Sequence, residues 1–213
     1  MLTSKQLKIF GLFSRNPFGE ITFKDLKVYS GEKSNSMVQN AIRRFIKEEL
    51  IKQRSIGTSK LYSLNHANFK IYSYLGLYGY DILPKTAIKS IMQVKEAVER
   101  EEQYYSIVVF GSYANSKYSK KSDIDIAIFI QNTKKKKKLE ALLNSVSNKS
   151  LIELDCHVIT SKDFAEMLKA DYANLGKEIV SKNLPIINPS IFYSLILTAI
   201  RHGYNPLSRK SRE

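Results

Sequence analysis

The spacing of apolar residues along the first third of the chain predicts three helices followed by a β-hairpin. Apolar positions recur at helical spacing over Leu2–Phe13, and a second, short helix is expected over Thr22–Tyr29 with Thr22 as its N-cap. A third helix is expected over Ser36–Glu49, beginning with a capping box at Ser36. Two strands, 52–56 and 60–64, then flank a turn that contains glycine, which is typical of a hairpin with a basic tip.

The remainder of the chain alternates between helices and strands. A helix is expected over Lys85–Gln103, and strands are expected over 106–110, 123–130 and 151–159. A run of five lysines, 134–138, lies between the second and third of these strands. Because positive charge at a helix start opposes the helix macrodipole, we expect this run in a loop. After residue 160 the pattern predicts helices only.

A break in the pattern near Pro84 predicts two domains. We assign residues 1–66 to the first domain, 67–84 to a linker or connecting helix, and 85–213 to the second domain. The fold class we expect is α/β (α+β), in which the second domain has a small mixed sheet flanked by helices.

Charge and cysteine content narrow the classes of partner and compartment. The chain has 34 Lys and Arg against 20 Asp and Glu, a formal net charge of +14. Such an excess favours a polyanionic partner such as nucleic acid, although a lysine-rich solubilising surface stays open. One cysteine excludes an intrachain disulfide, and three scattered histidines do not favour zinc. With no apolar run of about 20 residues and no signal-peptide core, we expect no membrane segment and a cytoplasmic protein.

Two of the predicted strands carry aspartates on their polar faces. In the strand that begins at Asp123, isoleucines alternate with Asp123 and Asp125, so the two carboxylates share one face. Like charges about 6–7 Å apart repel, and a divalent cation is the simplest compensation. The next strand places Asp155 on its polar face in the same way. Three carboxylates suit two metal ions about 3.5–4 Å apart, although a lone Asp-x-Asp is more often a solvated strand start.

The segment upstream of the aspartates favours a metal site over a solvated strand start. Gly111 and Ser112 follow the first of these strands, and ten residues separate Ser112 from Asp123-Ile124-Asp125. This arrangement, with Asp155 as a third acid, closely resembles the signature of the minimal nucleotidyltransferases of the DNA polymerase β-like superfamily. The resemblance covers about residues 85–188.

The resemblance implies a role for each of these residues. Gly111 and Ser112 would contact the triphosphate of a nucleotide, and Asp123, Asp125 and Asp155 would hold Mg²⁺, with Asp155 also helping to deprotonate an acceptor hydroxyl. We expect two Mg²⁺ ions, with Mn²⁺ as an alternative, and ATP as the nucleotide. Many members carry an Arg-Gly pair soon after the Gly-Ser turn. This chain has Asn115-Ser116 there, and Lys121 is our candidate for the missing positive charge at the nucleotide.

Residues 1–66 look like a winged helix-turn-helix domain. Such domains place the second helix of the motif in the major groove of DNA. That helix and the hairpin supply our candidate DNA-binding residues, which are Ser34, Asn35, Ser36, Gln39, Asn40, Arg43, Arg44, Arg54 and Lys60. A small helical domain used for dimerisation or partner docking is the alternative, and a homodimer stays open.

Three functions are compatible with these features. The first is an enzyme that transfers a nucleoside monophosphate, AMP in many relatives, to a hydroxyl. The acceptor we consider is a tyrosine of a HEPN-type partner protein, as in antitoxin-type members, with DNA binding added by the winged helix. The second is a DNA-binding transcriptional regulator whose nucleotidyltransferase domain is an inactive nucleotide sensor, which the missing Arg-Gly pair favours. The third is an interaction scaffold that uses neither site.

Overall fold

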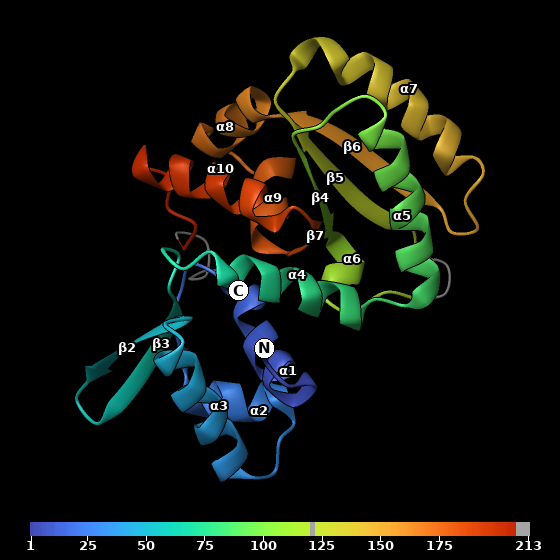
Figure 1. Cartoon of the computed structure of the whole chain (residues 1–213). Coiled ribbons are helices and arrows are strands. Elements are labelled where there is room, and N and C mark those ends of the chain that lie inside the picture. Colours follow the sequence, from blue (N-terminus) through green and yellow to red (C-terminus); the bar gives the residue numbers. More distant parts are fainter. Residues whose placement is uncertain (120–121, 208–213) are drawn as a thin grey trace. The chain divides into compact units, whose positions relative to one another are not determined.

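The computed structural model describes residues 1–119 and 122–207, which form two compact units (Figure 1). The N-terminal unit comprises Met1–Tyr78 with Pro206 and Leu207, and the C-terminal unit comprises Gly79–Asn205. The division falls inside helix α4, Lys70–Ile82. No helix among the described residues is long and apolar enough to span a lipid bilayer.

The N-terminal unit combines three complete α-helices and the first part of α4 with a small antiparallel sheet. Its strand order is β1-β3-β2, and β2 and β3 form a hairpin. Phe10, Phe13 and Phe45 are fully buried and pack against one another in the core. Along the chain the elements are α1 (Ser4–Gly11), a 3-10 turn η1 (Leu12–Arg15), β1 (Ile21–Thr22), α2 (Phe23–Ser30), α3 (Asn35–Lys47), β2 (Ile51–Ile56) and β3 (Ser59–Leu64).

The start of α3 differs from the expected one. Ser34, not Ser36, is the N-cap, and its Oγ accepts a hydrogen bond from the Met37 N–H at 3.4 Å. The predicted capping box at Ser36 is therefore wrong. Ser34, Asn35 and Ser36 can all cap a helix. When the first of them takes that role, the other two become the first residues of the helix, and the Ser36 hydroxyl lies 2.7 Å from that of Ser34.

The C-terminal unit is built on a mixed sheet with the strand order β6-β5-β4-β7. β5 and β6 run parallel, and β4 pairs antiparallel with both β5 and β7. The elements are α5 (Lys85–Glu99), β4 (Tyr105–Phe110), α6 (Gly111–Ala114), β5 (Ile124–Ile130), η2 (Thr133–Lys135), α7 (Lys136–Ser147), β6 (Leu154–Thr160), α8 (Ser161–Lys169), α9 (Leu175–Ser181), β7 (Asn183–Ile187) and α10 (Pro189–Arg201). A small mixed sheet flanked by helices is what the sequence predicts.

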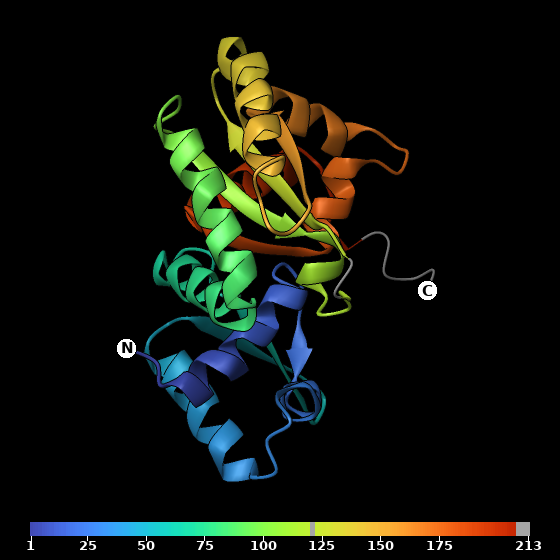
Figure 2. The same cartoon turned by 90° about the vertical axis from the view of Figure 1, so that its right-hand side faces the viewer.

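Helices cover both faces of this sheet (Figure 2). α5 and α7 lie on one face, and α8 and α10 lie on the other. The ring of Phe129 on β5 contacts Phe164 of α8 and Phe192 of α10, with centroids 4.8 and 5.2 Å apart. The face of β5 that begins with Asp125 therefore becomes apolar two residues later, and only the start of the strand is available for polar chemistry.

Two elements of the C-terminal unit correct the expectations. Residues 183–187 form strand β7, although the pattern predicted only helices after residue 160. The strand contains Pro185, which gives no ladder N–H and is tolerated because β7 is an edge strand with an irregular register to β4. Lys136 to Lys138 form the first turn of α7, where a loop was expected. Their charge is offset by acids distant in sequence, since Lys136 pairs with Asp163 at 2.7 Å and Lys138 with Glu101 at 2.8 Å.

Candidate active site

The register of β5 and β6 brings three carboxylates together. Asp125 lies directly opposite Asp155 in the parallel pair, and Asp123 immediately precedes β5. One oxygen from each carboxylate lies within 4.8 Å of the others. Asp123 and Asp125 are half-buried, whereas Asp155 is exposed. We call these residues the acidic triad. Their hard oxygen ligands fit Mg²⁺ or Mn²⁺ by donor chemistry.

Gly111 packs directly against the acidic triad. Its φ of +64° lies in the left-handed region, which favours glycine, and a Cβ at this position would lie 2.1 Å from Oδ2 of Asp125. No other residue type fits here unless Asp125 moves. The turn between β4 and α6 is thus shaped around the carboxylate.

Ser112 presents an unsatisfied hydroxyl in the same turn. Its Oγ is buried and has no hydrogen-bond partner among the described residues. Ser112 does not cap a helix, because α6 begins at Gly111 and its N-cap position is Phe110. A buried hydroxyl without a hydrogen bond costs free energy, which favours a ligand that accepts a hydrogen bond from it. A phosphate oxygen would do so.

The electrostatic environment of the triad favours a bound cation. Burial raises the pKa of Asp125, and the charges of Asp123, Asp155 and Glu178 raise it further, while His157 opposes them. Glu178 lies in the first turn of α9 and was missed from the sequence. No spacing pattern connects it with the strand aspartates, so only the packing of α9 reveals it. A divalent ion would relieve the repulsion among these acids.

The segment after the Gly-Ser turn keeps one feature of an Arg-Gly pair. Ser116 has a φ of 56°, a backbone conformation that glycine adopts more readily. Tyr118 stacks on the buried ring of Tyr113, with centroids 4.2 Å apart. Lys121, the predicted nucleotide-binding cation, lies outside the described residues.

The candidate DNA-binding residues of the N-terminal unit fall into two groups. Most are exposed on the start and outer face of α3 or on the hairpin: Ser34, Asn35, Ser36, Gln39, Asn40, Arg43 and Lys60. A groove of about 540 Å³ lies between α2, α3 and the hairpin, and it is lined by Gln39, Arg43, Lys60 and Lys24 among others. Its lining, as far as the described residues define it, includes no acid. This surface suits an anionic ligand.

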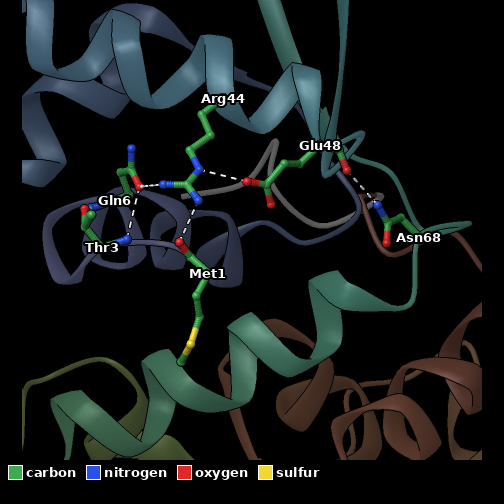
Figure 3. Close-up of polar contacts among 6 residues, drawn as sticks. All are labelled: Met1, Thr3, Gln6, Arg44, Glu48 and Asn68. Atoms are coloured by element: carbon green, nitrogen blue, oxygen red, sulfur yellow. Dashed lines mark hydrogen bonds and ion pairs between the residues drawn. The ribbon is translucent and has the colours of Figure 1, made fainter.

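The other two candidates are engaged within the unit. The guanidinium of Arg44 donates to Glu48, to Gln6 and to the backbone carbonyl of Met1 (Figure 3). Arg54 of β2 pairs with Glu20 through two hydrogen bonds. Arg44 therefore ties α3 to the start of the chain, and Arg54 holds the hairpin to the segment before β1.

Comparison with known proteins assigns the central part of the chain. Residues 91–186 match the nucleotidyltransferase domain family. The matched residues include the acidic triad, Gly111 and Ser112, and the match supports the prediction of a domain that transfers nucleotidyl groups. No curated protein matches the chain. A solved structure titled "Crystal structure of the toxin-antitoxin with AMP-PNP" is 16% identical with a TM-score of 0.35, covering 52% of this chain and 84% of that chain.

Proposed function

We propose that the chain is a Mg²⁺-dependent enzyme that transfers a nucleoside monophosphate, AMP from ATP, to a hydroxyl acceptor. The observation that supports this proposal is the acidic triad, with one oxygen of each carboxylate within 4.8 Å, beside a glycine that could not carry a side chain. The buried Ser112 hydroxyl, which has no partner in the part of the chain that the structure describes, adds a donor for phosphate.

The roles of the residues follow from this arrangement. Asp123, Asp125 and Asp155 would hold two Mg²⁺ ions, which supply Lewis-acid activation and charge neutralisation. Ser112 would donate to a phosphate oxygen, and the Gly111 backbone allows the phosphate to approach. The acceptor oxygen forms a bond to the α-phosphorus, the bond between the α-phosphorus and the bridging oxygen breaks, and pyrophosphate leaves. Asp155, the most exposed of the three, takes the hydroxyl proton.

The acceptor that we propose is a tyrosine hydroxyl of a HEPN-type partner protein, as the resemblance to antitoxin-type nucleotidyltransferases implies. A transfer assay tests both activity and acceptor. The protein is incubated with α-labelled ATP, Mg²⁺ and a lysate of its own cells, alongside a double variant, Asp123→Asn with Asp125→Asn. Asp171→Asn, an exposed acid outside the triad, is the matched control.

We expect a labelled protein band with the parent chain and the control, and none with the double variant. Absence of label with all four nucleotides would contradict transfer. If labelled ATP still bound in an equilibrium assay and changed DNA affinity, the alternative of an inactive nucleotide sensor would replace the enzyme. Asn115-Ser116 in place of an Arg-Gly pair is the feature that favours that alternative.

We also propose that the N-terminal unit is a winged helix-turn-helix domain that binds DNA. The order of three helices and a hairpin, the exposed polar face of α3 and the cation-lined groove support this. Arg43 and Lys60 lie in the groove lining and are the expected phosphate contacts, whereas Arg44 acts within the unit.

A pair of neighbouring substitutions tests the DNA proposal. Arg43→Ala should weaken DNA binding and lower the slope of log affinity against log salt by about one, because one phosphate contact is lost. Arg44→Ala should leave that slope unchanged but lower the thermal stability of the N-terminal unit, because its contacts to Glu48, Gln6 and Met1 are lost. Fluorescence anisotropy at several salt concentrations measures the slopes. Equal slopes for the parent chain and Arg43→Ala would remove Arg43 from the contact set.

A further inference from the structure

His157 contacts the acidic triad from the same strand as Asp155. Its Nε2 lies 3.0 Å from Oδ2 of Asp155, and since a carboxylate accepts, the ring N–H must donate. The ring also lies against Phe110, with centroids 5.8 Å apart, and Phe110 is buried at the end of β4. The imidazole therefore joins the carboxylate to a fixed apolar wall.

Asp155 needs such support more than the other two acids do. Its side chain is 53% exposed, and β6 is an edge strand of the described sheet. An exposed aspartate samples several rotamers and exchanges hydrogen bonds with water. Asp123 and Asp125 are half-buried, and Asp125 is further confined by Gly111. The least confined carboxylate is thus the one that receives a hydrogen bond from a packed imidazole.

We propose that His157 is a positioning residue for the acidic triad. By donating to Oδ2 of Asp155 it leaves the other carboxylate oxygen free for the metal ion and the acceptor hydroxyl. Groups that hold a metal-ligating side chain in this way tune affinity and activity, and their loss typically costs about 10- to 100-fold. The inference rests on the proposed function, because it assigns Asp155 to the metal site.

Two substitutions separate the hydrogen bond from the packing of the ring. His157→Phe keeps an aromatic ring against Phe110 but removes the donor. His157→Gln keeps an N–H donor within reach of Asp155 but removes the ring. If His157 positions Asp155, the Phe variant loses function and the Gln variant retains most of it. A histidine that only fills space on the strand predicts the opposite order.

The decisive readout is metal binding, which does not depend on turnover. Free Mn²⁺ is measured by electron paramagnetic resonance as each variant is titrated with Mn²⁺ in the presence of α,β-methylene-ATP, which cannot be cleaved at that position. We expect the affinity of His157→Phe to fall about 10- to 100-fold and that of His157→Gln to change by no more than about threefold. In the transfer assay, kcat of the Phe variant should fall more than the KM for ATP rises. Calorimetry checks that each variant is folded, and His157→Leu replaces the Phe variant if that one is not.

The outcomes separate the inference from the proposed function. If the parent chain binds Mn²⁺ with the nucleotide and His157→Phe binds it equally well, the positioning role is overturned and the proposed function stands. The same holds if His157→Gln is as impaired as His157→Phe, because then the ring rather than the donor matters. If the parent chain binds no Mn²⁺ with any nucleotide, both proposals are overturned together.

Discussion

Replacing Gly111 by alanine tests whether the Gly-Ser turn is built around the acidic triad. The added Cβ would lie 2.1 Å from Oδ2 of Asp125, whereas ordinary van der Waals contact begins at 3.4 Å. The carboxylate or the turn must therefore move by 3.4 minus 2.1, about 1.3 Å, before the side chain fits. A displacement of about 1 Å at a reacting centre can lower turnover about 100-fold.

The same substitution also strains the backbone. At the φ of +64° seen at Gly111, an L-residue costs about 1–2 kcal/mol relative to glycine. We therefore expect Gly111→Ala to lower the free energy of unfolding of the C-terminal unit by about 1–2 kcal/mol or more. Label transfer from α-labelled ATP and scanning calorimetry measure the two effects on one preparation.

Gly203→Ala is the matched control for strain alone. Gly203 lies in the same unit and has a φ of +97°, but a Cβ there meets nothing within 4 Å. It should lower stability while leaving transfer and Mn²⁺ affinity near those of the parent chain. The reasoning is refuted if Gly111→Ala, once shown to be folded, transfers label and binds Mn²⁺ as the parent does.

Three smaller perturbations test other contacts. Burial lowers the pKa of His66, whose ring stacks on Phe18. Because the unfolded chain then binds a proton more readily, stability of the N-terminal unit should fall as pH drops below about 6.5, and His66→Gln should flatten that fall in calorimetry at stepped pH. The hydrogen bond from Lys136 lowers the pKa of Asp163. Lys136→Met should therefore lower the free energy of unfolding by at most about 1 kcal/mol at neutral pH, and by progressively less below about pH 4. Denaturant titrations at two pH values would show this. Ser116→Gly removes a serine from a left-handed conformation. It should raise the free energy of unfolding of the C-terminal unit by up to about 1 kcal/mol, and with it the melting temperature. A lower melting temperature would contradict this.

Much of the candidate site follows from strand periodicity. Alternation along β5 and β6 puts Asp125 and Asp155 on one face of the sheet, because successive side chains point to opposite faces. The sequence alone does not state which strands are neighbours, and the family resemblance supplied that step. Once β5 and β6 pair in parallel, Asp125 and Asp155 become direct neighbours.

What the sequence could not predict depends on partners distant along the chain. The lysine run forms a helix start because Asp163, 27 residues from Lys136, supplies a charge that local reasoning does not see. β7 was missed because a five-residue apolar segment with a proline is compatible with several structures until an edge of the sheet is available. Glu178 reaches the acidic triad only through the packing of α9.

The two neighbouring arginines of α3 show that the sequence alone does not tell which charged side chains are available to a partner. Arg43 and Arg44 are equivalent as sequence letters, and both were candidates for DNA contact. In the fold Arg43 is exposed in the groove lining, whereas Arg44 donates to three groups of its own unit (Figure 3). A net charge of +14 thus overstates the cations available to a partner, because part of it serves the fold.

Several features of the segment from Gly111 to Asp125 carry a local cost in folding free energy, although others lie elsewhere, such as the left-handed Glu49 and Asn188. Gly111 and Ser116 both adopt left-handed conformations, the Ser112 hydroxyl is buried without a partner among the described residues, and Asp125 is held beside other acids with a raised pKa. None of these features stabilises the fold by itself. The last two become favourable when a cation and a phosphate are bound, since the cation offsets the carboxylates and the phosphate accepts a hydrogen bond from the Ser112 hydroxyl. An unpaired buried hydroxyl and a repelled carboxylate that one bound Mg²⁺-nucleotide would satisfy together are what a preorganised site requires.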